Sequence, residues 1–274
     1  MKKNLWVYLV LLVALGVTLA PLYWLLTISL KTVVEQFARP PVWFGFQVTL
    51  EHYYDIFFLR PFGTYLWNSV LVATGATLLS LVLGVSAAYA LARLPMNRNL
   101  NRHLSFWILS TRMVPPIVTI LPLFLLLRDF GLLNSRLGLV IVYTGFNLPF
   151  VVWMMRGFFE DLPRELEEAA WMDGSSRLRA LVEIVLPLVA PGLAATAVFC
   201  LLIAWNEFLF ALILTQTDAA MTLPVGIAGR VTQYEIKWGA MSAAGVVAIV
   251  PVFLFALAVQ RYLVRGLSLG AVKG

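Results

Sequence analysis

The stretch LWVYLVLLVALGVTLAPLYWLLTISL, residues 5–30, contains no charged side chain. As an α-helix it would be about 39 Å long, which exceeds the roughly 30 Å hydrocarbon core of a bilayer. A signal peptide has a shorter apolar region than this. We therefore expect residues 5–30 to be retained as a membrane-spanning helix.

The composition of the whole chain agrees with this first segment. Of the 274 residues, 61% are hydrophobic and 12% are charged, against about 45–50% and about 25% in soluble domains. Long apolar blocks suit lipid, where every backbone polar group must be paired within its own helix. The composition predicts an all-α integral membrane protein. We attribute the net charge of +6 to residues that orient the spans, and we expect no binding to nucleic acid.

Charged residues divide the chain into six expected spans, at residues 5–30, 66–92, 104–127, 137–155, 188–215 and 238–260. With the N-terminus inside, 12 basic residues would lie in inner segments and 7 in outer ones. This bias predicts that both termini are cytoplasmic. The polar excursions are too short to form a soluble core, so we expect a single domain over residues 1–274.

Two features of the expected spans concern packing and irregularity. Ala76, Ser80, Gly84 and Ala88 recur every four residues, which predicts close helix packing in lipid. The span at 104–127 is expected to be broken, because Arg112 interrupts it and three prolines, Pro115, Pro116 and Pro122, prevent an unbroken helix. We expect Arg112 to reach the interface at the inner end of a shortened span, with a gate as the alternative.

The loop 156–187 contains the segment GFFEDLPRELEEAAWMDG, residues 157–174. Asp161 is suited to cap a helix of about three turns. Gly174 is suited to end that helix in a left-handed conformation. The sequence therefore predicts a sharply terminated helix on the cytoplasmic side.

A second helix is expected to follow directly. Ser175 or Ser176 would cap it, and Pro187 and Pro191 would bend the chain into the fifth span. The result would be a helix-turn-helix between the fourth and fifth spans.

The first of these helices combines small, aromatic and acidic residues. Ala169 and Ala170 would let the backbone of a partner approach closely. Trp171 would anchor the contact, and Glu167 and Glu168 would accept hydrogen bonds. A helix lying on lipid headgroups is the alternative, but its acidic residues suit an anionic leaflet poorly. We therefore expect this loop to dock onto a protein.

The same loop resembles the signature of ABC importer permeases. Residues 168–170 read Glu-Ala-Ala, and after three residues, Gly174 and nine further residues, residues 184–187 read Ile-Val-Leu-Pro. Segments 204–208 and 222–226 and the tail 266–274 are similar to the maltose-permease G-subunit branch, and the likeness covers nearly the whole chain.

In that family the loop enters a cleft on a separate ATP-hydrolysing subunit, and we name residues 156–187 the coupling loop. The resemblance implies that the residues that couple to the ATPase are Glu167, Glu168, Ala169, Ala170, Asp173, Gly174, Ile184, Leu186 and Pro187. It also implies that the tail contacts the ATPase, through Leu267, Ser268, Leu269, Gly270, Lys273 and Gly274.

The resemblance further implies a function and partners. The chain would be one of two related permease subunits in an inner membrane, importing a mono- or oligosaccharide by alternating access. Its partners would be an ATP-binding dimer and an extracytoplasmic sugar-binding protein. The chain has no Gly-x-x-x-x-Gly-Lys-Ser/Thr sequence, so ATP and Mg²⁺ are expected on the partner ATPase and no cofactor on this chain.

Asn206 and Glu207 are the candidates for the solute pathway. An acidic side chain in an apolar span costs roughly 2.5–3.5 kcal/mol unless it faces protein, water or a partner. Adjacent helix positions point about 100° apart. We therefore assign Asn206, whose amide both donates and accepts, to the sugar, and Glu207 to an interhelical or outer-gate contact.

Other functions remain open. An importer of a polyol or of a glycerol phosphate ester is the alternative within transport. A membrane-embedded enzyme would need paired catalytic groups, which the sequence does not show. His52 and His103 lie outside the spans without companion ligands, so no metal site is expected.

Overall fold

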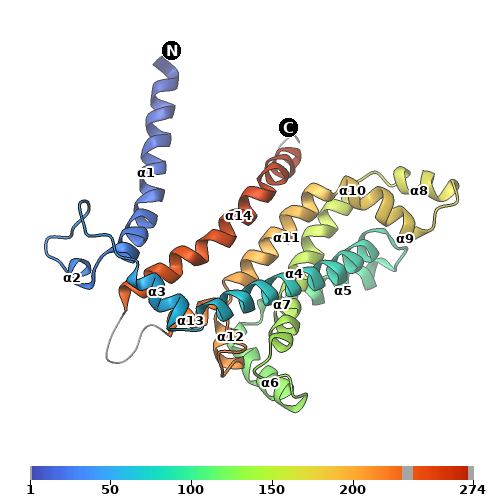
Figure 1. The fold of residues 1–274 in the computed structure, drawn as a ribbon. Coiled ribbons are helices and arrows are strands. Elements are labelled where there is room, and N and C mark those ends of the chain that lie inside the picture. The colour runs from blue at the N-terminus through green and yellow to red at the C-terminus, as the bar shows by residue number, and fades with distance from the viewer. Residues whose placement is uncertain (1, 230–236, 271–274) are drawn as a thin grey trace. The chain divides into compact units, whose positions relative to one another are not determined.

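The structure is a computed structural model that describes residues 2–229 and 237–270 (Figure 1). Its elements are α1 (Lys2–Leu30), α2 (Val33–Gln36), α3 (Glu51–Phe58), α4 (Phe62–Arg93), α5 (Arg98–Ser110), the 3-10 helix η1 (Thr111–Met113), α6 (Pro116–Asp129), α7 (Arg136–Glu160), α8 (Glu165–Met172), α9 (Arg177–Ala180), the π-helix η2 (Leu181–Val185), α10 (Leu186–Leu188), α11 (Ala190–Trp205), α12 (Leu209–Leu214), α13 (Leu223–Ala228) and α14 (Trp238–Gly270). The described part of the chain is thus helical, as the composition predicted.

Four helices in the described part are long and apolar enough to cross a bilayer: Trp6–Leu30, Phe62–Arg93, Arg136–Glu160 and Trp238–Leu257. They coincide with the first, second, fourth and sixth predicted spans. Two bent pairs also qualify when each pair is taken together. Arg98–Met113 meets Pro116–Asp129 at 95°, and Arg177–Leu188 meets Ala190–Trp205 at 81°. The structure therefore supports four to six spans, and the count of six stays a prediction.

The predicted span at 104–127 is broken where its prolines indicated. α5 ends at Ser110, and α6 starts at Pro116 after the 3-10 turn. A proline suits the first helical position because the amide proton it lacks would have no partner there. Pro122 lies inside α6 without ending it, so only part of the predicted disruption occurs.

The predicted span at 188–215 is wrong as one continuous helix. α11 ends at Trp205, Asn206 forms its C-cap, and α12 begins only at Leu209. The sequence has neither proline nor glycine at this break, and Asn206 is a weaker signal of a helix end than either of them.

The chain divides into two compact units, residues 1–66 with 223–251 and residues 67–222 with 252–274. In the first unit, Lys31 is only 1% exposed, and its ammonium lies 4.5 Å from the ring centroid of Trp24 and 5.2 Å from that of Phe46. Such cation–π contacts partly replace lost hydration. Burial lowers the pKa of Lys31, and Glu35 acts in the opposite direction. A single permease domain over residues 1–274 stays a prediction.

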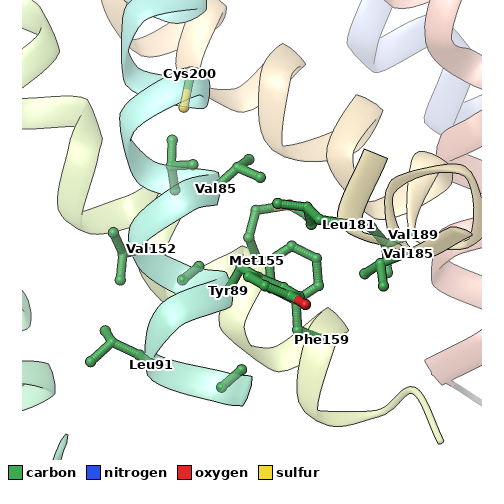
Figure 2. Packing of buried hydrophobic residues seen from close by; sticks show 13 residues of the cluster. Val85, Tyr89, Leu91, Val152, Met155, Phe159, Leu181, Val185, Val189 and Cys200 are labelled. Carbon is green, nitrogen blue, oxygen red and sulfur yellow. The ribbon is translucent and has the colours of Figure 1, made fainter. Parts of the chain in front are cut away.

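The core of the second unit is formed where α4 packs on α7. The predicted small-residue stripe on α4 is buried, and a Cβ atom at Gly84 would lie 2.6 Å from Cγ1 of Val151. The stripe therefore packs within this chain. Figure 2 shows the adjoining cluster, in which Tyr89 of α4, Met155 and Phe159 of α7 and Val185 of η2 lie together.

Candidate functional site

The coupling loop is closed at Gly174 by a Schellman motif. Gly174 has a φ of +85°, a conformation that costs little only for glycine. The N–H of Gly174 donates to the carbonyl of Trp171 at 3.0 Å, and the N–H of Ser175 donates to the carbonyl of Ala170 at 2.9 Å. These two bonds define the motif. The predicted left-handed cap is confirmed.

The start of α8 differs from the prediction. Asp161 forms the C-cap of α7, and Arg164 holds the N-cap position of α8, which runs from Glu165 to Met172. A proline disfavours helical backbone at the residue before it. Pro163 therefore breaks the helix between Asp161 and the start of α8. The helix consequently has about two turns instead of three.

One face of α8 is open to a partner. Its exposed residues, with those of its C-cap, are Glu165, Leu166, Glu168, Ala169, Trp171, Met172, Asp173 and Gly174. Met172 is 88% exposed, although a large apolar side chain favours burial. This face therefore combines apolar anchors with acidic acceptors, and we name these eight residues the knob.

Glu167 does not belong to the knob, although it was predicted together with Glu168 as a residue that contacts the ATPase. Its side chain is 2% exposed and its Oε1 lies 2.7 Å from Nε of Arg93, which is 5% exposed. The hydroxyl of Tyr89 donates to Oε2 at 2.6 Å. Both carboxylate oxygens are thus engaged inside the chain, and Ala170 beside it is also buried.

Further bonds fasten the loop to the same end of α4. Arg93 donates through Nη2 to the carbonyl of Leu162 at 2.9 Å. Arg164 donates to the carbonyl of Ala92 at 3.3 Å. We name Tyr89, Arg93 and Glu167 the internal tie. From the sequence, Arg93 was expected only to orient the span, because a basic residue at the end of a span is usually a flanking charge.

The second half of the coupling loop returns the chain to the membrane. Ser176 accepts a hydrogen bond from the N–H of Arg179 at 3.3 Å, which confirms it as a helix cap. Arg177 lies over the ring of Trp171 at 5.3 Å and joins the two helices. Val185 and Val189 are buried in the cluster of Figure 2. Of the predicted contact residues here, Ile184 and Leu186 are half-buried and Pro187 is exposed.

Asn206 and Glu207 lie in the break between α11 and α12. The N–H groups of Phe210 and Ala211 donate to the two carboxylate oxygens of Glu207, at 2.8 and 3.1 Å. Glu207 thus satisfies free donors at the start of α12, where the helix dipole favours a negative charge. Asn206 is exposed and donates to the carbonyl of Leu202 at 2.8 Å.

Arg112 lies in η1, at the 95° bend between α5 and α6. Its guanidinium carbon is 5.0 Å from the ring centroid of Phe150 on α7. A cavity of about 470 Å³ opens beside it, lined by α6 and the middle of α7.

The tail is described only in part. Residues 267–270 continue α14, which ends at Gly270. Lys273 and Gly274 lie outside the described residues. The contact of this tail with an ATPase stays a prediction.

The sequence matches a family model described as "Binding-protein-dependent transport system inner membrane component" over residues 80–269. The match covers more than half of the chain and includes the coupling loop and the break at Asn206. The chain belongs to this family.

Two relatives of this chain support its resemblance to sugar permeases. It is 40% identical to the sulfoquinovosyl glycerol transport system permease protein SmoH of Agrobacterium fabrum, covering 93% of this chain and 89% of the relative. It is 35% identical to the trehalose/maltose transport system permease protein MalG of Thermococcus litoralis, covering 94% and 92%.

A solved structure shows the same fold. It is that of a bacterial ABC transporter involved in the import of the acidic polysaccharide alginate, and one of its chains matches with a TM-score of 0.80 at 24% identity, covering 96% of both chains. The predicted kinship with carbohydrate ABC permeases of the maltose type is confirmed.

Proposed function

We propose that the chain is the transmembrane permease subunit of an ATP-driven carbohydrate importer, which moves a mono- or oligosaccharide into the cytoplasm by alternating access. It would work with a second permease subunit, an ATP-binding dimer and an extracytoplasmic sugar-binding protein. ATP and Mg²⁺ would be bound by the ATPase. The relatives named above support the solute class.

The coupling loop carries this proposal. The knob is exposed on a helix whose end is fixed by the Schellman motif. An exposed surface with several large apolar side chains on one short helix marks a contact site. Docking of the knob into a cleft on the ATPase would cover these side chains.

The internal tie would convert docking into movement. A force on α8 reaches α4 through the Arg93–Glu167 ion pair and Tyr89. It reaches α7 and α11 through the packed cluster of Figure 2. Packed elements of this kind move as rigid bodies. Closure of the ATPase dimer would thus displace the inner ends of the spans, without a covalent intermediate on this chain.

The membrane arrangement follows from the same proposal. Each bent pair would cross once, which would give six spans, and the bias of the basic residues supports an arrangement with both termini in the cytoplasm. The coupling loop then lies on the cytoplasmic side with the ATPase. Asn206 would contact the sugar, and Glu207 would hold the start of α12.

An importer of a polyol or a glycerol phosphate ester is the alternative. The named cargo of the Agrobacterium relative contains glycerol, which favours this alternative over a membrane-embedded enzyme.

Reconstitution tests the proposal. The chain would be purified in mild detergent with its ATPase and second permease, placed in proteoliposomes with the binding protein, and assayed for uptake of radiolabelled maltose, trehalose, glucuronate and glycerol 3-phosphate. We expect uptake of a sugar that requires both ATP and the binding protein. Turnover of a substrate by the purified chain alone would contradict the proposal.

A matched pair of variants tests the knob. Ala169→Trp places a large side chain where close approach is expected, and it should abolish binding of the ATPase. Leu78→Trp introduces the same side chain at an exposed site on α4 and should leave binding intact. Equal ATPase recovery with both variants would remove the knob from the interface.

A further inference from the structure

Arg112 lies beside the middle of α7, away from both ends of that helix. Phe150, which its guanidinium contacts, is about 21 Å along the helix from Arg136 and about 9 Å from Arg156, at 1.5 Å per residue. A guanidinium that reached the inner interface would lie at the level of Arg156. With Arg156 at the inner end of the proposed span, Arg112 contacts α7 within the bilayer, where an ionisable side chain is a candidate functional group.

The cavity next to Arg112 is otherwise nearly apolar. Of its described lining residues, none is acidic, and the only other polar side chains are Thr111 and Thr119. Each threonine donates to a backbone carbonyl of its own helix, that of Ile108 or Pro116, and keeps its oxygen free to accept. The volume of about 470 Å³ is within the range of small-molecule sites.

Arg112 has no hydrogen bond or ion pair with another described residue. Its contact with Phe150 uses the face of the guanidinium and leaves the N–H donors at its edge available. A guanidinium edge in an apolar cavity matches a planar or tetrahedral anion.

The cavity adjoins the break in the fifth span. Phe146 lines the cavity, and its ring centroid lies 4.5 Å from that of Phe210. The N–H of Phe210 is one of the two donors that Glu207 accepts. The Arg112 cavity and the Asn206 break are therefore neighbours within one unit.

We propose that this cavity is an anion subsite of the solute pathway, in which Arg112 binds the carboxylate, sulfonate or phosphate group of an acidic sugar. The proposal rests on the proposed function, and it narrows the solute class to sugars that carry a negative charge. The two threonine oxygens accept hydrogen bonds from the sugar hydroxyls.

The test compares matched sugars in proteoliposomes that contain the complete importer and its binding protein. The probes are radiolabelled cellobiose and cellobiouronic acid, and glucose and glucuronate. We expect wild-type uptake to favour the acidic member of at least one pair. Arg112→Gln should lower that uptake about tenfold or more, as expected for the loss of a charge-assisted hydrogen bond, and Arg112→Lys should restore much of it.

Two further variants separate binding from folding. Gly145 lines the cavity, and a Cβ atom there would meet no other atom within 4 Å, so Gly145→Ala should be tolerated and Gly145→Leu should occupy part of the cavity and lower uptake. Arg128→Gln removes an exposed arginine of α6 that pairs with Asp129 and should leave uptake unchanged.

Each remaining outcome overturns the subsite. If the importer takes up neutral sugars with ATP and Arg112→Gln leaves that uptake unchanged, the proposed function holds and the anion subsite is excluded. Loss of the second permease from Arg112→Gln assigns the arginine to an acidic group of that subunit. An Arg112→Gln defect seen only in vesicles with phosphatidylglycerol, and not in pure phosphatidylcholine, assigns it to lipid. Absence of ATP-dependent uptake of every sugar removes the proposed function as well.

Discussion

Arg93 and Arg112 belong to the same unit, and each interrupts or ends an apolar stretch. They differ in their burial and in the groups that they contact. Arg93 is buried and paired with Glu167, and it also donates to the carbonyl of Leu162. Arg112 lies beside a cavity, its guanidinium is 5.0 Å from the ring centroid of Phe150, and it has no ion pair with another described residue.

The difference separates two uses of a charge in a membrane protein. A buried pair holds two elements together, because removing one partner leaves the other charge without compensation. An open cation next to a cavity has its donors available for a ligand. Arg93 is therefore expected to matter for structure and coupling, and Arg112 for the solute.

The largest expected effect comes from breaking the pair. Glu167→Ala leaves the buried Arg93 with its bond to Leu162 but without a counter-ion, which should cost about 3–5 kcal/mol of folding free energy. The midpoint of thermal unfolding in detergent should fall clearly. Arg112→Gln, the matched change at the open cation, should leave the midpoint nearly unchanged.

A double variant sharpens this prediction. Arg93→Met combined with Glu167→Leu replaces the pair with apolar groups and should recover most of the lost stability. If Glu167→Ala and Arg112→Gln shift the midpoint equally, the contrast between the two arginines does not hold.

The next largest effect should come from Gly174→Val. A β-branched residue at a φ of +85° is strained by about 1–2 kcal/mol or more. The coupling loop should lose its turn, and ATP-dependent uptake should fall while membrane insertion persists. Gly157→Ala, at a glycine with open space and an ordinary helical conformation, is the control, and uptake should be retained. Normal uptake by Gly174→Val at equal expression would exclude a coupling role for this turn.

The contrast between a paired and an open group recurs at the break in the fifth span. Glu207→Gln weakens two bonds to a charged acceptor and should cost about 1–2 kcal/mol, seen as poorer assembly of the complex on size-exclusion chromatography. Asn206→Ala removes an exposed amide and should leave assembly intact while lowering sugar uptake. Normal uptake by both variants would make this pair structural.

The smallest effect is expected at the tail. Removal of residues 267–274 should leave the complex intact and change its ATP hydrolysis by about a few-fold, because chain termini usually contribute little to folding. The ATPase rate of the purified complex, with and without sugar-loaded binding protein, measures this. Identical rates would show that the tail has no part in coupling.

The sequence predicted those parts of the fold that depend on local rules. Charge-free stretches predicted four helices, because lipid imposes one pattern on every span. The left-handed C-cap of α8 could be predicted from Gly174, because few residues other than glycine adopt a positive φ. The break before α6 could be predicted from Pro116, because a proline lacks the backbone N–H that a continuous helix needs.

The remaining parts depend on contacts that are distant in sequence. Glu167 and Glu168 are adjacent and chemically alike, and only the packing of α8 against α4 decides that Glu167 is inside. The break at Asn206 depends on the Glu207 carboxylate, which supplies acceptors for a new helix start. The interface position predicted for Arg112 stays a prediction, but its contact with Phe150 could not be predicted, because hydropathy alone does not show which ring of another helix lies beside it.

The central claim is that α8 and α4 move together when the ATPase closes. Pulsed electron spin resonance between labels at Glu165 on α8 and Val82 on α4 tests it most directly. Both positions are exposed, and the lone Cys200 would be replaced by alanine. With labels on the ATPase dimer reporting closure, we predict that the 165–82 distance stays constant within about 2 Å, as for a rigid body. A larger change in that distance during closure, in a complex that still imports sugar, would contradict the account.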